Sequence, residues 1–473
     1  MDNLFPRSAP FGGWPSNARH ISGMMGSTNA PNHHPLLFQH HNNSNYFCSN
    51  GLTPTKILNE KIRARDWDAA RVRVLSHPWD AFYRAKPNQR NHNNNTSNNN
   101  NATPLHLACL YRAPLDVVQL LLDANPQALL CQDSEGWTPL HVILLYGDSE
   151  EVALMLIRRG GAQAAAVQSR IVGAPLHLAF RHGCSTTIIK ELLRVNPKMA
   201  TTANEYATKP ARILWYQFSR NPENEQLLQE LAAQQQRDMS TVMTTRQEES
   251  LRELVERLTL LVLAAKGKHH HYNPRSHSKS ATTILHDVVM ATEETLGDLS
   301  PFLPLIVLLH PELVRTTDDS GDLPLHKAAS YRPASCNGSG LRRTASMPSL
   351  AARYNQHGAT KDPVDVLIQS YPLAASIPNR LGHLPLHIAL SRGQRTWRTG
   401  VSSILLAAPQ VILTLDSETQ LFPFQLAAAA MASSSMEEAN EDEDTRDDTE
   451  QALETILELL LACPHAMPAP SSQ

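Results

Sequence analysis

The sequence is poor in the residues that several classes of protein require. Aromatic residues make up 5% of its 473 residues, so a core must come mainly from leucine, alanine, valine and isoleucine, which favours packed helices over β-sandwiches. No two of the six cysteines lie three residues or less apart, which excludes a zinc ribbon and a redox Cys-x-x-Cys motif. Their sparse distribution is typical of reduced thiols in an intracellular protein. The cysteines are Cys48, Cys109, Cys131, Cys184, Cys336 and Cys463.

Charge of one sign and long apolar runs are lacking as well. The formal net charge is −3, from 42 basic and 45 acidic residues, so we expect no nucleic-acid partner and no anionic membrane surface. The longest apolar runs, near Leu258–Ala265 and Phe302–Leu309, are far shorter than the roughly 20 residues of a membrane span. Met1–Pro10 carries no apolar stretch typical of a secretory signal. We therefore expect an intracellular protein, cytoplasmic or nuclear, without a membrane span.

Sequence motifs for catalysis are also missing. The chain has no glycine-rich phosphate loop, no Gly-x-Ser-x-Gly elbow, no His-Glu-x-x-His pair and no kinase catalytic-loop signature. We therefore predict that the protein is not an enzyme, and we expect no catalytic residue, cofactor or metal site.

What the sequence does contain is a repeated motif. Thr103-Pro104-Leu105-His106 recurs at Thr138 and, with alanine in the first place, at Ala174; two further copies begin with leucine. Weaker echoes occur at 209–214, 283–286 and 422–427. The motif residues of the five clear copies are Thr103, Pro104, Leu105 and His106; Thr138, Pro139, Leu140 and His141; Pro175, Leu176 and His177; Pro324, Leu325 and His326; and Pro385, Leu386 and His387.

Each copy predicts a pair of short helices. Proline suits the first helical position, where the backbone N–H has no intrahelical partner, and threonine before it can cap the helix. A second apolar helical stretch follows and tends to stop at a residue that precedes proline, as at Asn125-Pro126 and Asn196-Pro197. Neither helix can bury its apolar face alone, so the units must stack on one another.

This pattern resembles the ankyrin repeat, whose signature Thr-Pro-Leu-His-x-Ala recurs about every 33 residues. The resemblance implies an all-α, ankyrin-type helical solenoid in which a β-hairpin finger precedes each helix pair. Asp133–Trp137, Asp319–Asp322 and Asn379–Gly382 match such fingers, with glycine supplying a turn of positive φ. It also implies that the motif histidines bridge backbone groups within and between repeats.

By the same resemblance, the protein binds partner proteins on a concave surface of finger tips and first helices. Tyrosine and arginine combine large contact area with directed hydrogen bonds. The candidate binding residues at the matching positions are Tyr111, Tyr146, Arg181, His182, Tyr331 and Arg392.

Composition divides the chain into two blocks of repeats. Block 1 should be preceded by a disordered leader and separated from block 2 by a polar linker or helix. The leader is 1–50; block 1 is 51–220 with an Asn-rich insertion at 88–102; the polar segment is 221–250; block 2 is 251–473 with insertions at 266–281, 332–361 and 432–450.

One insertion carries a possible control point. In Arg342-Arg343-Thr344-Ala345-Ser346-Met347-Pro348 the arginines suit a basophilic kinase, and the proline two residues after Ser346 resembles the phosphoserine motif of 14-3-3 ligands. Ser346 is thus a candidate phosphosite and 14-3-3 a candidate partner. Two functions follow: a non-enzymatic scaffold or adaptor for protein partners, or a phosphorylation-switched regulatory or targeting subunit of an enzyme complex.

Overall fold

A computed structural model describes most of the chain after the predicted leader. All of the regular elements in this part are helices, and no strand is present among the described residues. The predicted all-α, ankyrin-type helical repeat fold is confirmed. The described residues are 54–84, 101–147, 149–170, 172–233, 243–267, 283–291, 295–331, 362–391, 395–437 and 443–462.

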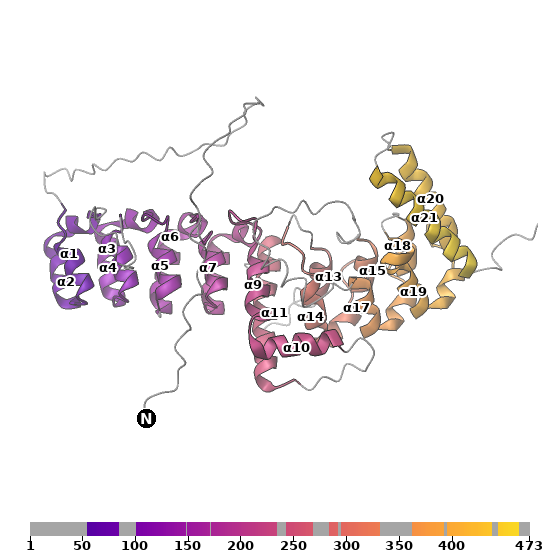
Figure 1. Ribbon diagram of the computed structural model, residues 1–473, viewed down its shortest axis with the longest axis horizontal. Coiled ribbons are helices and arrows are strands. Elements are labelled where there is room, and N and C mark those ends of the chain that lie inside the picture. The colour runs from indigo at the N-terminus through magenta and orange to yellow at the C-terminus, as the bar shows by residue number, and fades with distance from the viewer. Residues whose placement is uncertain are drawn as a thin grey trace, which may run out of the picture. The chain divides into compact units, whose positions relative to one another are not determined.

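The helices form pairs, and successive pairs stack on one another (Figure 1). We call the first helix of each pair the inner helix and the second the outer helix. An extra helix, α10 (Pro222–Ala233), lies in the sequence between the members of the fifth pair. The pairs in the described residues are α1 (Ile57–Arg63) with α2 (Trp67–Ser76), α3 (Pro104–Leu110) with α4 (Leu115–Ala124), α5 (Pro139–Tyr146) with α6 (Glu150–Ala166), α7 (Pro175–Arg181) with α8 (Thr186–Val195), α9 (Pro210–Ser219) with α11 (Thr245–Ala265), α13 (Ile284–Val289) with α14 (Leu303–Leu309), α15 (Pro324–Ala329) with α17 (Pro363–Ser370), α18 (Pro385–Ser391) with α19 (Ser402–Ala407), and α20 (Pro423–Glu437) with α21 (Glu443–Ala462).

Most outer helices are followed by one capping residue and then a proline, as the sequence predicts. Asn125 and Asn196 have φ near −145° and end α4 and α8, because a residue before proline avoids the helical region. The asparagine amides then donate to the carbonyls of Ala81 and Ala162 in the preceding repeats, at 3.1 and 3.2 Å. A short turn of helix starts at each of these prolines: η1 (Pro78–Phe82), η2 (Pro126–Leu130), η3 (Pro197–Ala200), η6 (Pro311–Arg315), η8 (Pro372–Ser376) and η10 (Pro409–Leu413). The remaining short turns are η5 (Ser300–Phe302) and η9 (Trp397–Val401).

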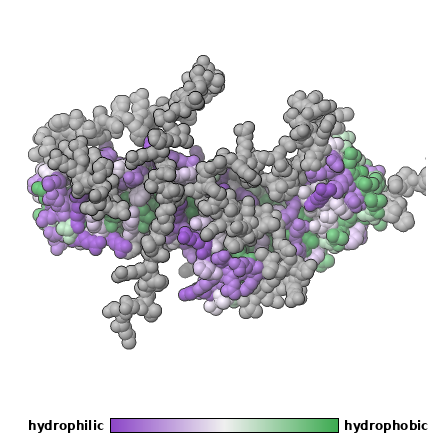
Figure 2. Space-filling view, viewed as in Figure 1, coloured by the Kyte–Doolittle hydropathy of each residue, from purple (hydrophilic) through white to green (hydrophobic). Residues whose placement is uncertain are grey.

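Inner helices pack side by side in two runs. The first run of repeats, residues 54–219, joins α1, α3, α5, α7 and α9; the second run, residues 283–462, joins α13, α15, α18 and α20. In the view of Figure 2, hydrophilic side chains predominate among the coloured residues of the first run.

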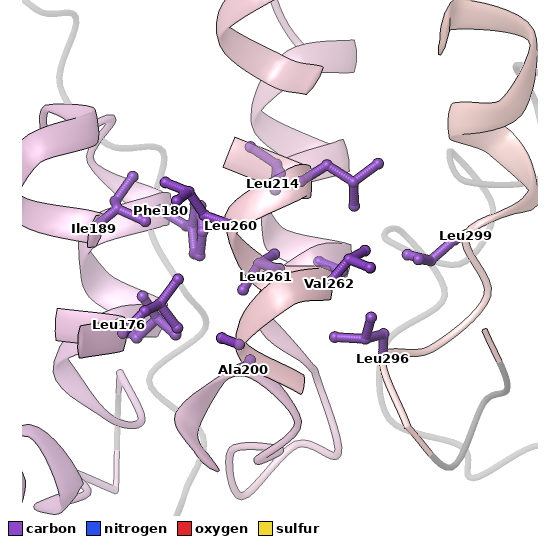
Figure 3. Close-up of a cluster of buried hydrophobic side chains, with 14 of the residues drawn as sticks. Leu176, Phe180, Ile189, Ala200, Leu214, Leu260, Leu261, Val262, Leu296 and Leu299 are labelled. Atoms are coloured by element: carbon purple, nitrogen blue, oxygen red, sulfur yellow. The ribbon is translucent and has the colours of Figure 1, made fainter. Parts of the chain in front are cut away.

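Helix α11 connects the two runs. It contacts α8, α9 and η3 of the first run and α13 and α14 of the second. Figure 3 shows Leu260, Leu261 and Val262 of α11 between Phe180 of α7 and Leu299, which precedes α14. Leu261 is fully buried, so the two runs share one hydrophobic core.

A buried arginine closes the base of the predicted insertion at 332–361. Arg395 is 2% exposed and donates at 2.8 Å to the carbonyl of Ala328, in α15, and to that of Thr399. The same guanidinium pairs with Asp362, whose carboxylate caps α17. The ends of α15 and α17 are therefore held together although the insertion itself lies outside the described residues.

Candidate protein-binding surface

The turns between repeats are built around one acceptor side chain. Asp133 Oδ1 accepts hydrogen bonds from the backbone N–H groups of Glu135 and Trp137, at 3.0 and 2.9 Å, while Gly136 takes a φ of 77°. This Asx-type turn needs a short carboxylate or amide at its start and a residue that tolerates positive φ. The same bonds form at Asn204, Asp318 and Asn379. The finger predicted from 319 thus begins one residue earlier.

Two motif histidines of the first run, His106 and His141, join one repeat to the next. His106 Nδ1 accepts from the Thr103 backbone N–H at 3.2 Å, which leaves the proton on Nε2 to donate to the carbonyl of Trp137 at 3.0 Å. His141 repeats this pattern with Thr138 and with the carbonyl of Gly173. Each ring therefore caps its own helix and fixes the following turn.

The other motif histidines make fewer of these bonds. His177 and His326 accept at Nδ1 from the first backbone N–H of their motif, but their buried Nε2 atoms form no hydrogen bond of good geometry within the described residues, although the carbonyls of Thr208 and His383 lie close enough to oppose, in part, the lowering of the pKa of the two rings by burial. His387 bonds the carbonyl of Thr414 at 3.2 Å. His286, in one of the weaker echoes, bonds the carbonyl of Asp322 at 2.8 Å and so occupies the same place in its repeat.

Burial keeps these rings neutral. It lowers the pKa of His106, His141 and His177 to about 4, because a charged imidazolium loses its hydration in the core. Across the described ranges, no three histidine, cysteine, aspartate or glutamate side chains gather in a way that could hold a metal ion. Within the same ranges, no helix is both long and apolar enough to cross a membrane.

The carboxyl ends of the first run's inner helices lie next to one another, because α3, α5, α7 and α9 pack in that order. Tyr146 is 42% exposed at the end of α5, and Arg181 and His182 are exposed at the end of α7. We call this set the tyrosine–arginine row: Tyr111, Arg112, Tyr146, Arg181, His182, Tyr216 and Arg220.

Hydrogen bonds and ring contacts order the row. Arg112 Nε donates to the carbonyl of Tyr146 at 3.3 Å, which joins the ends of α3 and α5. The Gln217 amide of α9 bonds the carbonyl of Arg181 in α7. The Arg220 guanidinium lies 6.0 Å from the centre of the Tyr216 ring. The surface is therefore pre-arranged by neighbouring repeats.

The row carries positive charge without acidic residues of its own. The sequences of α3, α5, α7 and α9 contain no aspartate or glutamate. Nearby acidic residues include Asp116 and Glu150 at the starts of outer helices and Glu223 at the start of α10. They pair with Arg71, with the hydroxyl of Ser185 and with Arg246. An anionic partner would thus meet arginine and tyrosine along the row.

An aromatic pair beside the row was not predicted. The rings of Trp137, at the end of a turn, and Tyr146 lie 6.2 Å apart and tilted. Trp137 directly precedes a motif threonine, and this position was the only hint in the sequence.

The remaining predicted positions lie at or beyond the limits of the described residues. Tyr331 is half-buried at the last described position before the insertion. Arg392 and Ser346 lie outside the described residues.

Comparison with known proteins agrees with this geometry. Residues 89–143 match the family model for ankyrin repeats (many copies). No match to a curated protein was found for the chain. The matched residues include α3, α4, the Asp133 turn and the start of α5, which are the elements that the motif histidines join. Residues 89–143 are therefore similar to ankyrin repeats, a type of protein–protein interaction module, and the stacked helix pairs of the described residues have the arrangement of such repeats.

Proposed function

We propose that the protein is a non-enzymatic scaffold or adaptor that binds an acidic segment of a partner protein along the tyrosine–arginine row. The observation that carries this proposal is the adjacency of the carboxyl ends of α3, α5, α7 and α9, four inner helices that carry no aspartate or glutamate. We place this activity inside the cell, in the cytoplasm or the nucleus.

Physical chemistry favours this partner. Arginine pairs with carboxylates through a rigid fork of donors, and tyrosine contributes area at a low entropy cost. The row is also held by the helices beneath it, so little order has to be gained on binding. Association should weaken as salt rises, because exposed charges are screened.

The test is quantitative capture from cell extract by the full chain and by a Tyr146→Ala, Arg181→Ala variant. We expect the variant to recover at least about tenfold less of each partner than the unchanged chain. The matched control is Arg159→Ala, Lys198→Ala, which changes two exposed residues on α6 and η3 and should retain them. Melting curves of both variants check that the fold is intact. Equal recovery by the two variants would contradict the proposal.

The alternative, a phosphorylation-switched regulatory or targeting subunit, stays a hypothesis from the sequence. Its phosphosite, Ser346, lies outside the described residues, and the comparisons give no support for 14-3-3 docking. A Ser346→Ala variant that loses a partner retained by the row variant would favour this alternative.

A further inference from the structure

The last helix of the described stack has an exposed apolar face. Leu453, Leu457 and Leu461 of α21 are 53%, 55% and 65% exposed, and their spacing of four places them on one face of the helix. An exposed apolar stripe of this kind is typical of an interaction surface. Figure 2 shows hydrophobic residues gathered over the C-terminal helices, which Figure 1 colours yellow.

The opposite face of α21 is already occupied. Thr455 and Leu459 are buried, and α21 packs against α20 and η9. The Thr455 hydroxyl accepts a hydrogen bond from the backbone N–H of Trp397 at 2.8 Å, and Arg398 pairs with Glu454 at 2.9 Å. These contacts fix the rotation of the helix and leave the leucine stripe outward.

Acidic residues border the stripe on one side. Glu450, Glu454 and Glu458 repeat with the same spacing of four. Each lies three residues before a leucine of the stripe. The sequence of α21 contains seven acidic residues and a single arginine. A ligand for this face must therefore be apolar along its centre and positive along its edge.

We propose that this stripe docks a basic amphipathic helix of a partner protein, with leucine-like side chains on Leu453, Leu457 and Leu461 and lysine or arginine against Glu450 and Glu458. Helix-to-helix docking uses apolar anchors at intervals of three and four residues, and flanking charges set the choice of partner. A second copy of the chain fits less well, because two acidic α21 helices would bring like charges together. This surface differs from the tyrosine–arginine row in its position and in the sign of its charge. The proposal therefore does not rest on the function proposed above.

The experiment measures binding of the full chain to two synthetic 20-residue helical probes by fluorescence anisotropy. Both probes carry leucine at every third or fourth position; one has lysine at the flanking positions and the other has glutamate. We expect the lysine probe to bind at least about tenfold more tightly than the glutamate probe, with an affinity that falls as salt rises.

Two variants locate the site. Leu453→Ser, Leu457→Ser, Leu461→Ser should weaken the lysine probe by about tenfold or more. The matched control is Leu373→Ser, Leu406→Ser, Leu413→Ser, which changes three leucines that are 66%, 81% and 59% exposed away from α21 and should leave binding unchanged. Glu450→Gln, Glu458→Gln, which leaves the pair of Glu454 with Arg398 intact, should weaken binding and reduce its salt dependence.

Several outcomes would overturn the proposal. These are no binding of the lysine probe, equal binding of both probes, or an equal loss in the leucine variant and its control. A dimer in sedimentation that the α21 leucine variant dissociates would assign the stripe to a second copy of the chain instead.

Discussion

Two motif histidines of the first run of repeats lie near arginines, whereas those of the second run lie near carboxylates. Beyond the effect of burial, Arg84 and Arg181 further lower the pKa of His106 and His177. In the second run, burial also lowers the pKa of His326 and His387, but the carboxylates of Asp322 and Asp416 act in the opposite direction.

The polar links between repeats differ in the same way. In the first two motif copies of the first run a threonine and a histidine supply the capping bonds, whereas leucine replaces the threonine at 323 and 384 in the second run. There, side chains of the turns bond one another: Lys327 pairs with Asp318 and Asp322, and the Asn379 amide donates to Asp322 at 2.8 Å. One backbone arrangement is thus stabilised by different chemistry, and the two runs should respond differently to acid and to mutation.

Acid should separate the two runs most strongly. Unfolded histidine binds protons near pH 6.5, but His106, His141 and His177 do so only near 4. The contribution of these neutral rings to the free energy of unfolding is therefore complete above about pH 6.5 and is lost as the pH drops toward 4. At pH 5 each ring lowers the free energy of unfolding by about 2 kcal/mol relative to neutral pH, or by about 6 kcal/mol for the three. Hydrogen exchange at pH 7 and pH 5, corrected for intrinsic rates, should show larger losses of protection in the first run; equal losses would refute the comparison.

Removing Arg395 should break the second run selectively. Arg395→Ala leaves the half-buried carboxylate of Asp362 and the carbonyl of Ala328 without their partner, which costs about 3 kcal/mol. Arg398→Ala is the control, because this exposed arginine pairs with Glu454 at the surface and such pairs contribute about 0–1 kcal/mol. Chemical denaturation measures both. If the two variants unfold at the same denaturant concentration, Arg395 does not hold the ends of α15 and α17 together.

The shared core at α11 predicts a change that reaches both runs. Leu261→Ala opens a cavity between them and should cost about 2–5 kcal/mol. Protection from hydrogen exchange should fall in α7 and α8 as well as in α14, unlike the effect of Arg395→Ala. A loss confined to one side of α11 would show that the runs unfold independently.

A smaller difference is expected between two motif histidines. His141 makes bonds at both nitrogens, whereas His326 has one hydrogen-bonded nitrogen among the described residues. His141→Ala should therefore be more destabilising than His326→Ala by about 1 kcal/mol. Denaturation of the two variants in one buffer at pH 7.5 tests this ordering, and the reverse ordering would be inconsistent with the hydrogen bonds described.

Local features of the fold could be predicted from the sequence because their causes are local. Proline starts most inner helices, proline follows the ends of most outer helices, and Gly136, Gly321 and Gly382 take positive φ in the turns. An aspartate or asparagine three residues before each of these glycines marks the start of the Asx-type turn, a signal that the sequence analysis did not use.

Contacts between distant residues could not be predicted in this way. The pairing of α9 with α11 across α10 depends on which apolar faces fit together, as does the packing of Trp215 on Phe302, with ring centres 5.2 Å apart. Arg395 lies 67 positions from Ala328, whose carbonyl it binds, and nothing in the local pattern distinguishes it from an exposed arginine. The binding row is of the same kind: single positions were predicted, but its lack of acidic residues became clear only when the helices were placed side by side.

The most direct test of the proposed function is hydrogen exchange of the full chain with and without the partner that it captures. The account predicts that protection rises at the carboxyl ends of α3, α5, α7 and α9, where Tyr111, Tyr146 and Arg181 lie. Protection confined to the outer helices α2, α4, α6 and α8, or no change along the first run, would contradict it.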